Sequence, residues 1–281
     1  MNIKITSDST CDLGALEKER DIRILPLQVN LDDKAYRDGV DITPQDIFDF
    51  VAKTKILPKT SAPSIGEYEE FFEKELADCD ELIHFNISAK SSGSHSFAKQ
   101  AAERFNGRVR VIDSMALSSG QGLLVLKAAD MRDEGKSAAE IEETINELKT
   151  HVNTSFVPDQ LDYLHKGGRC SGMVMFVANA LKIHPKIVMN DGQLVQGGKY
   201  RGTMARCITQ YVQDLKNQYP SYDKTRCFVT HSSADKELVD VAKAAVAEHF
   251  EFDEVIETVA GSIITSHCGK GTLGVLFIYN K

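Results

Sequence analysis

The sequence lacks an excess of basic residues and a long apolar run, and each absence argues against a class of function. Its 33 lysine and arginine residues stand against 41 aspartate and glutamate residues, giving a net charge of -8. Broad binding of nucleic acid or anionic membrane surfaces is disfavoured, because such partners need cations. No apolar run approaches the ~18 residues of a membrane span, and Asp8 interrupts any signal-peptide core. We therefore expect no integral membrane span and a cytoplasmic location.

Paired cysteines are also missing. The six cysteines lack C-x-x-C spacing, so neither a structural zinc site nor a disulfide framework is predicted. His267 and Cys268 are adjacent, but no second pair of ligand residues lies near them in sequence. We expect free thiols and no bound metal.

The sequence has no convincing nucleotide or hydrolase motif. Gly269, Gly271 and Gly274 match G-x-G-x-x-G, but a strand rather than a helix is expected to follow. The same segment does not match the Walker A motif of nucleotide-binding proteins. No G-x-S-x-G motif marks a nucleophilic serine. We therefore predict no cofactor, and no kinase active site within this chain.

Short strands alternate with helices through the first half, which predicts a parallel sheet covered by helices on both faces. Strands are expected at 3–5, 22–29, 82–87 and 109–113, and helices at 13–20, after Thr43-Pro44, after Ser64, at 97–105, at 116–134 and after Ser137. Hydroxyl-rich loops follow several of these strands. Function gathers beyond the carboxyl ends of such strands, so we expect these hydroxyls to converge on one rim.

The pattern changes near Pro158, and the length also favours two domains. We predict an N-terminal α/β domain at 1–157 and a C-terminal mixed α/β domain at 158–281. The second contains a hairpin at 183–189 and 193–199 around Asp191-Gly192, helices at 203–219 and 235–250, and strands at 227–231, 255–259 and 275–279.

Two polar segments precede helices and suit an anion. In the first, Thr60 and Ser61 are expected on a turn fixed by Pro63, while Ser64 and Glu67 have the spacing of a capping box. The second runs from residue 88 to 94. Helix N-termini attract negative charge, although an ordinary loop and cap is the alternative.

Other motifs keep structural alternatives. Gly167-Gly168-Arg169 also fits a helix C-cap with a surface arginine, and His267 also fits a structural histidine. The apolar run 173–177 is expected either to line a ligand tunnel or to form a core helix.

Taken together, the motifs resemble the DegV family, the bacterial fatty-acid-binding proteins that serve as the acyl-carrying subunit of fatty-acid kinase. The resemblance covers nearly the whole chain and rests on the order of the motifs. The matching segments are Ser7-Asp8-Ser9-Thr10-Cys11-Asp12-Leu13, residues 60–67, Ile112-Asp113-Ser114, residues 164–169, residues 181–185 with Asp191-Gly192, Lys199-Tyr200-Arg201 and residues 267–274.

The resemblance implies a two-domain α/β protein, not itself an enzyme, that holds one long-chain fatty acid between its domains. A separate kinase catalytic subunit would phosphorylate the acid for phospholipid synthesis. The implied carboxylate contacts are Thr60 and Ser92, with Ser61 and Gly93 beside them. His267 and Arg201 are implied on the head-group side, and Arg169 is carried over with them.

The chain departs from the family pattern at three positions. Ser91 replaces a usual leucine and His95 a usual tyrosine in the second polar segment, and Lys270 replaces a usual proline. These changes affect the expected acyl-chain preference and partner surface. Two alternative functions stay open, a stand-alone acyl-ester hydrolase or acyltransferase using a serine with His267, and a lipid sensor that signals through protein contact.

Overall fold

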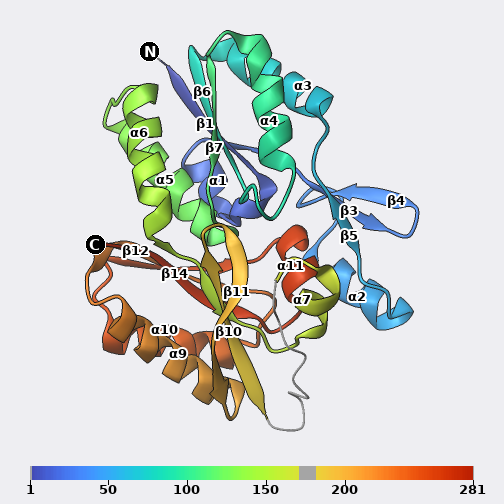
Figure 1. Ribbon diagram of the computed structural model, residues 1–281, viewed down its shortest axis with the longest axis vertical. Coiled ribbons are helices and arrows are strands. Elements are labelled where there is room, and N and C mark those ends of the chain that lie inside the picture. The colour runs from blue at the N-terminus through green and yellow to red at the C-terminus, as the bar shows by residue number, and fades with distance from the viewer. Residues whose placement is uncertain (1, 171–181, 281) are drawn as a thin grey trace.

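Two larger sheets lie one beyond the other along the long axis of the molecule, and a small third sheet projects from the side (Figure 1). The computed structural model describes residues 2–170 and 182–280. The apolar run 173–177, predicted to line a tunnel or form a core helix, lies outside the described residues.

The first sheet is parallel throughout, in the order β2-β1-β6-β7. Its strands are β1 (Ile3–Asp8), β2 (Ile22–Leu25), β6 (Glu81–Asn86) and β7 (Val109–Asp113). Helices α3 (Ile65–Glu75) and α4 (Ser94–Ala102) cover one face, and α5 (Ser119–Asp133) and α6 (Ala138–Leu148) cover the other (Figure 1). Burial on both faces is what parallel strands require, and the predicted parallel sheet is confirmed.

The small sheet differs from the prediction. Residues 22–29 were expected to form one strand, but the chain leaves the parallel sheet at Pro26, which has no N–H to donate to a ladder. The next strand, β3 (Gln28–Leu31), pairs antiparallel with β4 (Lys34–Arg37) and β5 (Lys59–Ser61). Thr60 therefore lies on a strand, and the predicted turn there is wrong.

The second large sheet is mixed, as predicted, in the order β11-β10-β9-β14-β12-β13. Its strands are β8 (Val152–Asn153), which also pairs with β14, β9 (Ser155–Val157), β10 (Ile183–Asn190), β11 (Gln193–Arg201), β12 (Tyr222–His231), β13 (Glu254–Val259) and β14 (Leu273–Tyr279). The hairpin of β10 and β11 turns at Asp191 and Gly192, which both have positive φ, so the predicted Asp-Gly turn is confirmed.

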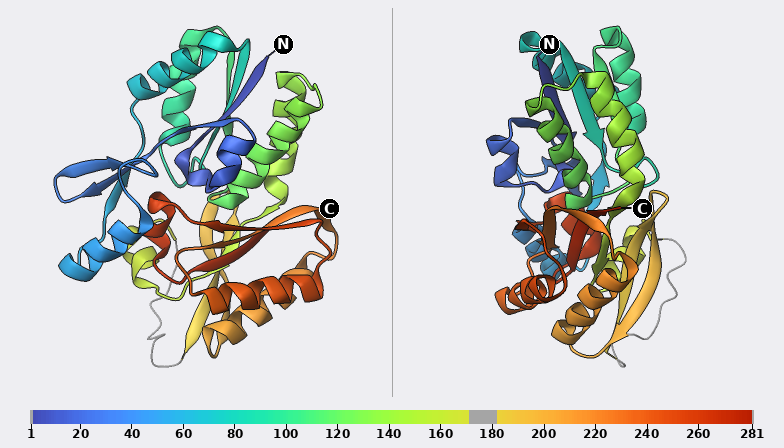
Figure 2. Two further views of the ribbon diagram at one scale, coloured as in Figure 1. Left: turned by 180° about the vertical axis from the view of Figure 1, so that it is seen from behind. Right: turned by 90° about the vertical axis from the view of Figure 1, so that its left-hand side faces the viewer.

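Helices α9 (Met204–Gln218) and α10 (Lys236–His249) pack on one face of this sheet. Its other face meets α5, whose Leu123 and Leu124 share a core with Phe228 and Leu276. The right-hand view in Figure 2 shows how the two halves follow one another along the long axis. Both β8 and β9 precede the predicted domain boundary at 157/158, yet pair with the second sheet.

Local signals predicted several helix starts correctly. Ser64 with Glu67 and Ser137 with Glu140 form the capping boxes of α3 and α6, and Thr43 caps α2 (Pro44–Thr54). The other helices are α1 (Ala15–Glu19), α7 (Asp162–Gly167) and α11 (Ser262–Cys268), with short 3-10 turns at Ser9–Cys11, Leu76–Asp78, Glu103–Phe105 and Lys149–His151. The helix α11 was not predicted, although it carries His267.

Within residues 2–170 and 182–280, no helix combines the length and apolar character needed to cross a membrane.

Candidate functional site

A cavity of about 350 Å³ is lined by residues from both halves of the molecule. At its mouth lie the exposed Gly93, Phe97 and Arg169, whereas Gly274 and Leu276, deep in the cavity, are buried. The larger apolar side chains along its wall are Leu27, Ile87, Phe97, Leu117, Phe156, Leu164, Leu194, Ile263, Ile264 and Leu276. The cavity is therefore mostly apolar, with its polar groups gathered in a few places.

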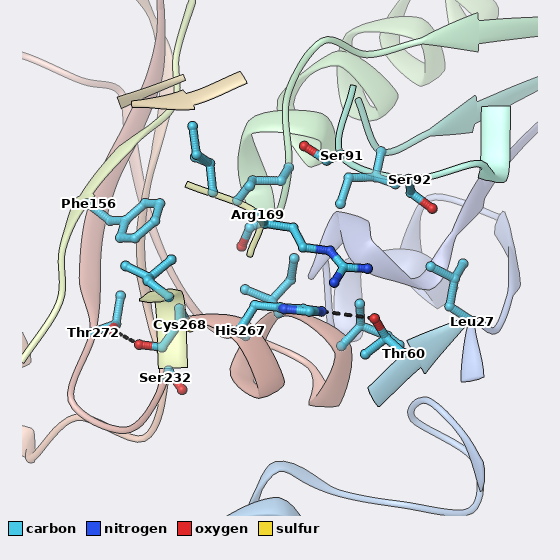
Figure 3. A pocket seen from close by; sticks show the side chains of 18 of the residues that line it. Leu27, Thr60, Ser91, Ser92, Phe156, Arg169, Ser232, His267, Cys268 and Thr272 are labelled. Carbon is cyan, nitrogen blue, oxygen red and sulfur yellow. Dashed lines mark hydrogen bonds between the residues drawn. The ribbon is translucent and has the colours of Figure 1, made fainter. Parts of the chain in front are cut away.

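Thr60 and His267 form a hydrogen-bonded pair on the cavity wall. The strand β5 carries Thr60, and the last turn of α11 carries His267. The Thr60 Oγ1 atom lies 2.9 Å from His267 Nε2, and Figure 3 shows the two groups facing one another. The bond joins residues 207 positions apart in the chain.

The environment of His267 keeps the imidazole neutral. Burial, with a smaller contribution from the Arg169 cation, lowers the pKa of His267 to about 4. The Nδ1 atom is buried and has no hydrogen-bond partner among the described residues. A buried N–H without a partner is rarer than a buried acceptor without one, so this geometry favours the proton on Nε2.

The tautomer of His267 decides what Thr60 can do. With its proton on Nε2, the imidazole donates to the Thr60 oxygen, and the threonine O–H is left to donate into the cavity. A hydroxyl held in this way is suited to an anionic acceptor. The pair is much less suited to nucleophilic catalysis, because none of the residues that the structure describes places a carboxylate on the imidazole.

Ser92 lines the cavity from the loop between β6 and α4. Its hydroxyl lies 2.8 Å from that of Ser94, and its oxygen accepts a hydrogen bond from the Ser94 N–H. The carbonyl of the buried Ser88 accepts from the N–H groups of Ser91 and Ser92 and so shapes this loop. The Ser88 hydroxyl in turn donates to the Gly192 carbonyl, which connects the loop to the tip of the β10–β11 hairpin.

The two arginines predicted for the head-group side lie in different places. Arg169 lines the cavity, and in Figure 3 its guanidinium points toward the side of the cavity that carries Thr60 and Ser92. One of its N–H groups donates to the Gly167 carbonyl at 2.9 Å. Arg201, at the end of β11, is exposed and is not among the described residues that line the cavity.

Hydroxyl groups in the more buried part of the cavity already form hydrogen bonds with other groups of the protein. The Ser155 hydroxyl is bonded to Asn153 and Tyr211, and the Thr272 hydroxyl donates to the Cys268 carbonyl. Further pairs link Ser232 with Thr265 and Thr230 with Thr258. Because these hydroxyls are hydrogen-bonded within the protein, they demand no hydrogen bond from an apolar group that lies against them.

The structure thus brings together most of the predicted site residues, namely Thr60, Ser61, Ser92, Gly93, Arg169 and His267. Sequence reasoning did not identify Leu27, Ile263 or Ile264 as cavity residues. No local signal could have done so, because each is one apolar residue among many. The described part of the chain holds no group of three or more His, Cys, Asp or Glu residues that could bind a metal ion.

The chain is similar to known proteins over nearly its whole length. A family model described as "Uncharacterised protein, DegV family" matches residues 2–280. A DegV domain-containing protein of Caldanaerobacter subterraneus is 33% identical over 277 residues, which cover 98% of this chain and 98% of that protein.

Solved structures with similar sequences share the fold. A DegV family protein from Thermus thermophilus, described as binding fatty acid, is 29% identical, with a TM-score of 0.92 and 100% of both chains covered. A protein from Eubacterium ventriosum described as binding stearic acid is 28% identical, with a TM-score of 0.85, and the match covers 99% of this chain and 98% of that one.

Proposed function

Because the chain belongs to the DegV family, we propose that it binds a long-chain fatty acid and presents the carboxylate to a separate kinase subunit. That subunit would carry the nucleotide and form the acyl phosphate. The observation that carries the proposal is a cavity with a mostly apolar wall, whose less buried part carries the hydroxyls of Thr60 and Ser92 and the guanidinium of Arg169. Relatives described as binding fatty acid or stearic acid support the same ligand class.

The acyl tail would supply most of the affinity. A chain of about 15 methylenes gains on the order of 10 kcal/mol on leaving water. One hydrogen bond to the charged head adds only about 1.5–3 kcal/mol. The tail therefore belongs against Phe156, Leu194 and Leu276, whereas Thr60 and Ser92 determine which end of the acid faces the mouth.

The mouth is suited to a carboxylate that must stay reactive. Thr60 and Ser92, beside Ser61 and Gly93, would donate neutral hydrogen bonds, and Arg169 would offset the negative charge. A deeply buried ion pair would instead hold the carboxylate away from a kinase. We assign His267 to the support of Thr60, and the exposed Arg201 to the side on which the phosphoryl group arrives.

The sequence gives a reason to place the nucleotide on another subunit. It has no Walker A motif, and its glycine-rich segment at 269–274 leads into β14 rather than into a helix. Stearate, the protein and labelled ATP should therefore give acyl phosphate only after a candidate kinase from the same organism is added. Acyl phosphate formed by the isolated protein would contradict this division of labour.

The stand-alone hydrolase is less well supported. The hydroxyl beside His267 belongs to Thr60, whereas the Ser92 hydroxyl is hydrogen-bonded to Ser94. The imidazole also has an unpartnered Nδ1 atom among the described residues. Turnover of an acyl ester by the isolated protein, lost in Ser92→Ala, would nevertheless favour that function over ours.

Fatty-acid binding is tested on the protein as purified. Protein produced in a bacterial host should carry a long-chain fatty acid in about a one-to-one ratio, because tail burial of this size gives tight binding. Solvent extraction followed by mass spectrometry identifies and counts the acid. Protein that is consistently empty and takes up no labelled stearate would refute the proposal.

The head-group assignment has its own test. Thr60→Val and Ser92→Ala each remove one donor, and each should weaken stearate binding roughly 10- to 100-fold, the worth of a hydrogen bond to a charged group. Isothermal titration calorimetry on delipidated protein measures the change. Ser96→Ala, an exposed change on the nearby helix α4, is the control and should bind as the unmodified protein does. Equal affinities for all the variants would remove Thr60 and Ser92 from the site.

A further inference from the structure

We propose that Asp38 and Asp12 are positioning residues that hold the start of α11, so that His267 at its end meets Thr60. The consequence for the ligand rests on the proposed function, since it takes Thr60 to donate to a carboxylate. The contacts that position α11 are made by residues of the chain itself.

Both carboxylates receive N–H groups at the start of α11. The Gly261 N–H donates to Asp12 Oδ1 and the Ser262 N–H donates to Asp38 Oδ1, each at 2.8 Å. Asp12 and Asp38 are buried, with 5% and 3% of their surface exposed. The first N–H groups of a helix have no partner within it, so these carboxylates fill a need that α11 cannot meet.

The second oxygen of each carboxylate is also held. The Ser118 hydroxyl, at the start of α5, donates to Asp12 Oδ2. The Ser9 hydroxyl donates to Asp38 Oδ2 at 2.8 Å and accepts from the Leu27 N–H. The two carboxylates are thus held in fixed orientations. Because they accept the first N–H groups of α11, they also fix where this helix begins.

The small sheet holds α11 at both ends. The Asp38 N–H donates to the Leu27 carbonyl beside β3, and the same strand pairs Val29 with Thr60 of β5. Asp38, directly after β4, therefore contacts the first turn of α11, and Thr60 of β5 contacts the last. Between them, Ile263 shares a core with Leu27 and Val29.

A helix this short depends on such contacts. The span Ser262–Cys268 is well below the length at which an isolated helix is stable in water, and its N-cap, Gly261, has no side chain to cap it. Loss of the Asp38 contact should therefore let α11 shift. Because His267 Nε2 and Thr60 Oγ1 are 2.9 Å apart, a small shift suffices to break their bond.

The first measurement uses ligand-free protein. The pKa of His267 is followed by NMR in the unmodified protein and in Asp38→Ala, with His267→Gln to assign the signal. We expect Asp38→Ala to raise the pKa of His267 from about 4 toward the ordinary value, because a displaced ring gains access to water. Asp38→Asn, which keeps one carbonyl acceptor, should restore most of the original value.

A matched control separates positioning from general loss of stability. Ser137→Ala removes the cap of α6, which is not part of the cavity wall among the described residues, and should lower the melting temperature while leaving the His267 titration unchanged. If Asp38→Ala does not fold, Ser9→Ala takes its place, since it frees Asp38 Oδ2 and should shift the pKa of His267 in the same direction by less. An unchanged His267 titration in the folded variant overturns the proposal.

The second measurement uses carboxyl-labelled stearate. Asp38→Ala should bind it about 10-fold more weakly, as expected when one donor to the carboxylate is misplaced. If the unmodified protein binds no stearate, the proposed function fails, yet the His267 titration still decides whether Asp38 positions α11. If stearate binds equally to both proteins and the titration is also unchanged, the positioning role alone is refuted.

Discussion

At the scale of single residues, the mouth of the cavity combines the neutral hydroxyls of Thr60 and Ser92 with the cation of Arg169. His267 is held neutral by burial, and it leaves the Thr60 O–H to donate. Arg169 stands at the exposed mouth, where its charge stays hydrated. Since buried ion pairs lose much of their attraction to desolvation, this arrangement would hold the proposed carboxylate without trapping it.

The depressed pKa of His267 predicts a pH dependence of stability. The pKa is about 4 in the folded protein and about 6.5 in the unfolded chain. The unfolded state therefore binds more protons between these values, so the contribution is complete above about pH 6.5 and is lost as the pH falls toward 4. Between about pH 7.5 and 5, the free energy of unfolding should fall ~2 kcal/mol further in the unmodified protein than in His267→Gln.

Urea denaturation of the two proteins at both pH values measures this difference. Both proteins contain the same other titratable groups, including the buried His84 and the carboxylates whose pKa values are raised. The contributions of these groups to the pH dependence of stability therefore cancel in the comparison. An equal loss of stability in both proteins would show that His267 does not titrate with a depressed pKa.

At the scale of elements, what could be predicted depended on whether the partners lie close in sequence. The capping boxes at Ser64 and Ser137 are complete within four residues, and both were predicted correctly. The helix α11 was missed because its N-terminal partners, Asp12 and Asp38, are 249 and 224 positions away. Thr60 was assigned to a turn for the same reason, since its strand exists only through pairing with β3.

Replacing a glycine by alanine should have opposite effects on stability in α5 and in α3. In α5, buried nearly all round, a Cβ at Gly122 would lie 2.7 Å from the Cys11 carbonyl oxygen and 2.8 Å from a Leu13 methyl carbon. Gly122→Ala should cost about 1–3 kcal/mol, as overpacking does. In α3, the exposed Gly66 has no atom within 4 Å of such a Cβ, and Gly66→Ala should stabilise by up to about 1 kcal/mol.

Thermal and urea unfolding of both alanine variants tests this contrast. Each variant is the control for the other, because both place alanine in a helix and differ in the space around it. Similar effects on the free energy of unfolding would mean that α5 is not packed against the 3-10 turn Ser9–Cys11 as described.

At the scale of the whole molecule, the two halves share a core and a cavity. One apolar cluster joins Ile5 and Leu124 of the first half to Phe228 and Leu276 of the second. The sequence change near Pro158 predicted a boundary, and that boundary remains a prediction. The resemblance to a family supplied the site residues by their order. It could not show that Arg201 is not among the described residues that line the cavity, because that depends on how the halves pack.

A ligand that fills this shared cavity should stabilise the whole protein. A ligand at about 100 times its dissociation constant adds ~2.7 kcal/mol to the free energy of unfolding when it binds only the folded state. Stearate should therefore raise the melting temperature of delipidated protein by roughly 5–10 °C, given the usual scaling for domains of this size. Acetate, which has the carboxylate without the tail, should leave it unchanged at the same concentration. Equal shifts with acetate and stearate would mean that the apolar end of the cavity contributes nothing to binding.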